Sequence, residues 1–170
     1  MKSTIGILLC LVAFIIHAQE KLPVLQIEGQ KTDQKIKVIS GAFAYINDVW
    51  ASKGLALSQE RTQTYFTKDT ALIINGKMVC KGYDEFTKHF QQVSQHIQGK
   101  FRFPLFEAIG VNNKVVVHFD EDIYDNHGTY YPANVIAIFT FDHDKIQKWE
   151  EVVNSPYFRQ AAASSVVYSK

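Results

Sequence analysis

The amino-acid sequence predicts an α+β fold in which a strongly curved, mostly antiparallel sheet wraps around helices from the first half of the chain. Two stretches before residue 100 carry apolar residues at helical spacing, and most of the chain from 101 to 154 has the pattern of strands. No Pro-, Gly- or Ser-rich linker interrupts this pattern. With 170 residues, 46% of them hydrophobic, the chain is long enough for one buried core and short for two.

The first 18 residues predict a signal peptide. The basic Lys2 precedes an apolar run over 5–16, which is shorter than the roughly 20 residues that a membrane-spanning helix needs. Ala18 suits the position before a cleavage site, although Ile16 is a less usual partner for it, and an uncleaved anchor is the alternative. We therefore expect a secreted or periplasmic protein, with a lead-in at 19–34, a single domain at 35–170, and no membrane association after cleavage.

The spacing of apolar residues predicts two helices. The first begins near Ile36 and ends near Lys53-Gly54, where a basic residue and a glycine suit a helix C-terminus. The second follows Gly82, has acidic residues in its first turn, and ends before Gly99. A weaker pattern over 58–66 allows a short helix between them. The apolar residues that define the two main stripes are Ile36, Ile39, Phe43, Ile46 and Trp50, then Tyr83, Phe86, Phe90, Val93 and Ile97.

The remaining segments indicate strands. Asn75-Gly76 between 71–74 and 78–80 predicts a tight hairpin. Further strands are expected at 101–109, 115–119, 130–141 and 146–153, with a possible edge strand around Val24 and a short helix at 157–163. The strand expected at 130–141 is apolar on both faces and is predicted to be central in the sheet. The acidic run 120–122 is predicted to be a solvated hairpin loop.

The order of several short motifs resembles the nuclear transport factor 2-like superfamily, and within it a SnoaL-like or ketosteroid-isomerase-like domain. The matching pieces are the segments 65–71, 75–76, 81–86, 138–142 and 145–150, and the helix over 36–50 matches the family's long first helix. The resemblance covers roughly 36–154. It implies a cone-shaped fold, a curved sheet closed by helices around an apolar cavity, in a family of enzymes, small-ligand binders and dimerising modules.

The resemblance does not imply ketosteroid-type isomerisation. That reaction needs a carboxylate base and acidic donors for an oxyanion. In this sequence the family's base position falls near Ile74 and its acidic donor position near Ala137, and neither side chain can move a proton.

Glu151 is the predicted acid or base. In the resembled fold, the strand face that carries Trp149, Glu151 and Val153 points into the cavity, where burial beside Trp149 would raise the pKa of the carboxyl group. The alternatives are that Glu150 points inward instead or that Glu151 pairs with a lysine at the rim. Tyr45 and Tyr131 are the candidate hydrogen-bond donors, and Glu107 is a weaker acidic candidate on an apolar strand face.

The predicted ligand-contacting residues combine apolar walls with one polar pair. His118 and Asp120 are two apart on a strand and share a face, so the carboxylate could orient the imidazole ring. Because Val117 and Phe119 have the opposite parity and the more apolar face, the pair is expected more often outside the cavity than in it. The full set of predicted ligand contacts is Trp50, Ala137, Phe139, Trp149, His118 and Asp120.

No metal site and no cofactor are predicted. The acidic run 120–122 with His127 lacks the glycine and closing carboxylate of a calcium loop and the converging ligands of a zinc site. His89 and His96 flank an apolar helical stripe and are interpreted as surface residues, and Cys80 is interpreted as a half-buried thiol. With 18 basic and 17 acidic residues, no strong field favours nucleic acid.

Two functions remain open from the sequence. One is a cavity that binds a small apolar or amphipathic molecule, with acid–base chemistry of the isomerase, cyclase or dehydratase kind. The other is a non-catalytic interaction module, a homodimer through the outer sheet face, with a vestigial pocket. Whether the protein is an enzyme is left open at this point.

Overall fold

The computed structural model describes residues 24–25, 31–103, 105 and 107–158, so the predicted signal peptide and its cleavage site lie outside the described residues. In chain order the elements are β1 (Val24–Leu25), α1 (Lys31–Ala51), α2 (Gln59–Tyr65), β2 (Phe66–Ile74), β3 (Lys77–Lys81), α3 (Tyr83–His96), β4 (Ile97–Phe101), β5 (Glu107–Val111), β6 (Lys114–Asp125), β7 (Tyr130–Asp142) and β8 (Lys145–Asn154). Within this described part, no helix is long and apolar enough to cross a membrane.

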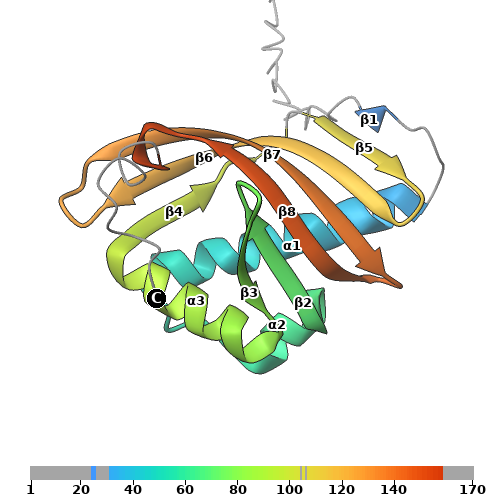
Figure 1. The fold of residues 1–170 in the computed structure, drawn as a ribbon, viewed down its shortest axis with the longest axis horizontal. Helices are drawn as coiled ribbons and strands as arrows, with labels where there is room; N and C mark the ends of the chain where they lie inside the picture. Colours follow the sequence, from blue (N-terminus) through green and yellow to red (C-terminus); the bar gives the residue numbers. More distant parts are fainter. Residues whose placement is uncertain (1–23, 26–30, 104, 106, 159–170) are drawn as a thin grey trace, which may run out of the picture.

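The strands form one curled, mixed sheet in the order β1-β5-β6-β7-β8-β2-β3, with β4 paired to β6 beside β5. The pairs β1–β5 and β2–β8 are parallel and the others antiparallel. The three helices lie on one side of the sheet, below it in Figure 1, and the sheet curves over them. The predicted α+β cone is therefore confirmed.

The helix boundaries follow the local signals in the sequence. α1 ends at Ala51. Two of the residues that follow, Lys53 and Gly54, have positive φ angles of 52° and 88°. The Gly54 N–H donates to the Val49 carbonyl oxygen at 2.7 Å, which closes the last turn. α3 starts after Gly82 and carries Asp84 in its first turn.

Two strand predictions are corrected by the structure. The single strand expected at 101–109 is two, β4 and β5, which pair with different parts of β6. The acidic run 120–122 is not a loop, because β6 continues through it to Asp125 and the turn comes at 126–129. The predicted hairpin at Asn75-Gly76 is confirmed, with positive φ at both residues.

An aromatic cluster fills the middle of the cone. The Phe43 ring of α1 lies 4.2 Å from the Phe101 ring, 4.7 Å from Phe119, and 5.7 Å from both Phe139 and Trp149, measured between centroids. All five side chains are buried. Beside this packed cluster, open space remains among the described residues where α3 faces the sheet.

Candidate functional site

A cavity of about 50 Å³ lies between α3, the end of α1 and the inner face of the sheet. That volume has room for a few water molecules. Apolar side chains form most of its wall, together with His89 from α3, Glu121 from β6 and Glu151 from β8. Trp50 and Trp149, the two tryptophans of the chain, also line it.

Glu151 is held in the middle of the sheet. Its strand β8 lies between β7 and β2, where Glu151 is opposite Ala137 on one side and Ile74 on the other. The Asn75 N–H donates to the Glu151 carbonyl oxygen at 2.8 Å, and the Asn75 side-chain oxygen accepts from the Val153 N–H at 2.9 Å. These two hydrogen bonds fix the position of the backbone that carries the Glu151 carboxyl group.

The Glu151 side chain points into the cone, as predicted, and only 9% of the residue is exposed. Its Oε2 atom is buried and has no hydrogen-bond partner among the described residues. Burial raises the pKa of Glu151 to about 7. The nearby Trp149 indole group has the opposite, smaller effect on the Glu151 pKa, although its N–H makes no hydrogen bond.

A second carboxyl group faces the same cavity. Glu121 is 7% exposed, and burial, reinforced by the charges of Glu151 and then Asp122, raises its pKa well above the usual range. His89 is half-buried, and burial lowers its pKa to about 4. At neutral pH, His89 is therefore uncharged and Glu151 is close to half ionised, and the raised pKa of Glu121 favours its protonated form.

The two indole groups are also without partners. Trp50 Nε1 and Trp149 Nε1 are buried and make no hydrogen bond within the described part of the chain. The Trp50 ring packs on Gly99 of β4, where an added Cβ would lie 2.8 Å from ring carbons. Unpaired buried donors carry a free-energy cost that a bound polar group can remove.

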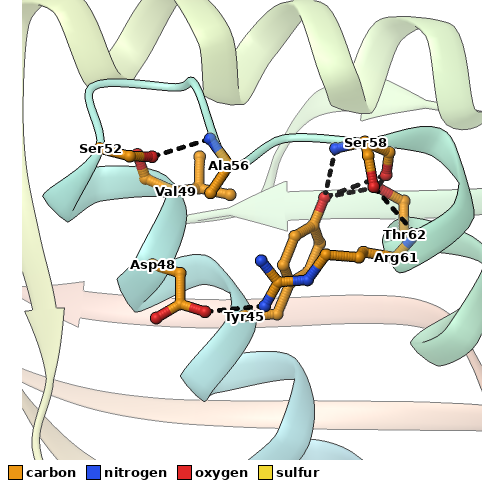
Figure 2. A network of polar contacts seen from close by, with 8 residues as sticks. All are labelled: Tyr45, Asp48, Val49, Ser52, Ala56, Ser58, Arg61 and Thr62. Atoms are coloured by element: carbon orange, nitrogen blue, oxygen red, sulfur yellow. Dashed lines mark hydrogen bonds and ion pairs between the residues drawn. The ribbon is translucent and has the colours of Figure 1, made fainter.

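The structure places Tyr45 away from this cavity. Its hydroxyl group accepts from the Ser58 N–H at 3.2 Å and lies 2.9 Å from Thr62 Oγ1, at the junction of α1 and α2 (Figure 2). The Arg61 guanidinium covers the Tyr45 ring at 4.6 Å and bonds Asp48 at 2.7 Å. Tyr45 therefore joins two helices and does not meet Glu151.

The other predicted polar residues also lie apart from Glu151. The Tyr131 hydroxyl, at the start of β7, donates to Asp125 Oδ2 at 3.2 Å. His118 and Asp120 have the strand parity opposite to that of the buried residues of β6, and Asn134 on β7 bonds to both. This pair is thus on the outer face, in agreement with the parity argument, and outside the cavity that Glu151 lines.

The predicted apolar contacts divide into two groups. Trp50 and Trp149 line the cavity, whereas Ala137 and Phe139 are fully buried neighbours that do not line it. Phe139 belongs to the aromatic cluster around Phe43. Glu107 is exposed at the start of β5 and is not an acidic group of the site.

Cys80 is buried, and burial raises the pKa of its thiol to about 12.

Sequence reasoning missed Glu121 and His89. The sequence pattern could have placed Glu121 inside the cone, because Glu121 lies two residues after Phe119 and four after Val117 on one strand, and alternate residues share a face. The acidic neighbours Asp120 and Asp122 suggested a loop and concealed that parity. His89 lies on the edge of the α3 stripe next to the buried Phe90, and the curl of the sheet brings that edge over the cavity.

Comparisons with known proteins agree with the fold. No family model matches the chain, and no curated protein matches it. Solved structures do match, among them an NTF2-like protein from Burkholderia xenovorans LB400, with 14% identity, a TM-score of 0.59, and coverage of 74% of this chain and 93% of that one. A SnoaL-like protein from Jannaschia sp. CCS1 has 10% identity, a TM-score of 0.61, and coverage of 83% and 98%.

An LEH-like epoxide hydrolase from M. tuberculosis also matches, with 12% identity, a TM-score of 0.59, and coverage of 81% of this chain and 98% of that one. At these identities the likeness concerns the fold. The chain has the nuclear transport factor 2-like, SnoaL-like fold that the sequence predicts.

Proposed function

We propose that the protein binds a small, mostly apolar molecule in the cavity beneath α3, and that Glu151 exchanges a proton with it. The observation that carries this proposal is the Glu151 carboxyl group, which is buried in an aromatic cavity with one oxygen unpartnered. A carboxyl group with a pKa of about 7 is suited to proton transfer at neutral pH, since both of its forms are populated there.

The two carboxyl groups divide the roles in this proposal. Glu151, half ionised at neutral pH, takes the proton, and Glu121, whose pKa is raised well above the usual range by burial, donates a hydrogen bond or a proton in its protonated form. The cavity of about 50 Å³ accepts only a small group. A larger ligand needs Phe158, which lines the cavity at the end of the described chain, to move outward.

The structural neighbours give this proposal coarse support. The fold is shared with a protein described as an LEH-like epoxide hydrolase and with one described as a SnoaL-like polyketide cyclase, which is consistent with a ligand-binding fold. Because a fold does not determine a reaction, the support for proton transfer comes from Glu151 itself.

A proton-abstraction probe tests this function without knowledge of the natural ligand. The probe is nitroethane, a molecule of the small size that the cavity accepts, whose α-C–H protons exchange for deuterium in D₂O when a base removes them; proton NMR follows the exchange. We expect the protein to accelerate this reaction, with a rate that rises through a midpoint near pH 7 as Glu151 ionises. Glu151→Gln should remove the acceleration and the pH dependence.

The neighbouring Glu150 provides the matched control. It lies on β8 next to Glu151 and forms an ion pair with Lys148 at 2.6 Å, with about a third of its side chain exposed. Glu150→Gln should leave the rate unchanged. Equal rates for wild type and Glu151→Gln would overturn the proposed role of Glu151.

A second candidate function is homodimerisation through the outer face of β7 and β8. Ile136 and Val152 are cross-strand partners there, with 52% and 64% exposure, and Ile138 is exposed beside them. This apolar patch lies on the face opposite to the helices, and a patch of this kind marks an interaction site. The proposed occupant is a second copy of the chain, since the patch can be self-complementary about a twofold axis.

Sedimentation velocity tests the dimer. Val152→Glu should shift the protein to the monomer, whereas Leu55→Glu, at a 90% exposed apolar residue outside the patch, should not. An unchanged sedimentation coefficient at both positions, or a monomeric wild type, would refute this candidate.

We also propose export of the protein, on the strength of the apolar run over 5–16. Expression of the full chain in a secreting host should yield a mature N-terminus at Gln19, measured by intact mass. Retention of residues 1–18 on the exported or membrane fraction would contradict cleavage.

A further inference from the structure

The cavity carries acidic groups without basic ones. Among its lining residues in the described chain are Glu121 and Glu151, and none is lysine or arginine. The titratable group that faces them from α3 is His89, which is uncharged at neutral pH. The next charged group, Asp122, is also acidic and is already bonded to Arg102 outside the cavity.

Four aromatic rings line the same cavity as these carboxyl groups, and neighbouring rings lie close to one another in a closed circuit. The ring of Trp50 lies 4.7 Å from that of Phe101 and 6.3 Å from that of Phe90. The ring of Trp149 lies 5.8 Å from Phe101 and 6.5 Å from Phe90. All four residues line the cavity. Aromatic rings, tryptophan above all, attract cations through their negative faces.

We propose that the cavity selects a small organic ammonium group, held between the four aromatic rings and the carboxylates of Glu121 and Glu151. This inference rests on the proposed function and names the chemical class of its ligand. A protonated amine supplies the positive charge that the cavity lining lacks, and its N–H groups can donate to the buried Glu151 Oε2.

The physical reason is the missing counter-charge. A buried carboxyl group stays protonated where no positive charge is near, and a cation within a few ångströms favours its ionised form. An ammonium group therefore replaces protons when it binds, whereas an anion is repelled and an alcohol leaves the protons in place. The small volume limits the group to a head of methylammonium size, with the rest of the ligand extending past Phe158.

The experiment compares propylammonium with its neutral isostere 1-propanol. Both tryptophans line the cavity, so the two indole N–H signals in a ¹H–¹⁵N NMR spectrum of the labelled protein report occupancy directly. At pH 8 we expect propylammonium to shift both signals with at least about tenfold higher affinity than 1-propanol. Propionate, the anionic probe, should shift neither.

Proton release provides a second readout that needs no variant. At pH 7 the binding of propylammonium should release about half a proton from Glu151, because a pKa of about 7 leaves that group half protonated, and the raised pKa of Glu121 adds to this release. Calorimetry in two buffers of different ionisation enthalpy measures this number. No release is expected with 1-propanol.

Conservative variants complete the test. Glu151→Gln and Glu121→Gln should each weaken propylammonium binding at least about tenfold with little effect on 1-propanol, and Glu150→Gln should change neither. Equal affinity for the amine and the alcohol, without proton release, would overturn the ammonium class and leave the proposed cavity function intact. If neither probe moves an indole signal, both proposals fail.

Discussion

Replacement of Glu151 by glutamine should make the protein more stable above neutral pH. The pKa of Glu151 is about 7 in the folded protein and 4.5 when the side chain is exposed. The folded state therefore binds more protons than the unfolded state between these values, so folding stability falls as the pH rises through this window. The full shift corresponds to about 3 kcal/mol of stability present below pH 4.5 and absent above pH 7.

Urea unfolding at pH 5 and pH 8 measures this effect. Fluorescence of the two tryptophans, both in the cavity, follows the transition. Wild-type protein should lose about 2–3 kcal/mol more stability between pH 5 and pH 8 than Glu151→Gln does, with Glu150→Gln behaving as wild type. Because the Glu151 charge also raises the pKa of Glu121, removing that charge lowers the Glu121 pKa, and this contribution to the difference has the same sign. A parallel pH dependence for wild type and Glu151→Gln would refute the burial of an ionisable Glu151.

Three further predictions concern the surrounding structure. Tyr45→Phe removes the hydroxyl group that bonds Thr62, so urea unfolding should show a loss of about 1–2 kcal/mol, while the cavity indole signals keep their positions. Gly99→Ala places a Cβ 2.8 Å from the Trp50 ring, so it should destabilise by about 1–3 kcal/mol and shift the Trp50 indole signal; an unshifted signal would contradict that contact. In a chain without residues 1–18, Cys80 is the only thiol, and with a pKa of about 12 it should react with a disulfide reagent only after unfolding.

The fold was predictable because local and periodic signals coincide in this sequence. Apolar spacing located α1 and α3, and the Asn75-Gly76 pair located the β2–β3 hairpin. Inward parity placed Glu151 in the cone. Each of these patterns depends only on residues that are close in sequence, so the fold of the rest of the chain does not alter what it predicts.

The composition of the site was predictable only in part, because it depends on how distant segments meet. Tyr45 has helical spacing towards the core, but the position of α2 decides that its hydroxyl bonds Ser58 and Thr62. Glu121 and Glu151 share a cavity only because β7 lies between their strands and the sheet curls. The spacing of residues in a single sequence does not predict the curl of the sheet.

The most direct test of the central claim is an NMR titration of the glutamate side-chain carboxyl carbons in ¹³C-labelled protein. We expect a carboxyl signal with a midpoint near pH 7 that is missing from Glu151→Gln, and a second signal, missing from Glu121→Gln, that titrates well above the range of exposed glutamates. Titration of every glutamate near pH 4.5 would contradict a buried acid–base pair in this cavity.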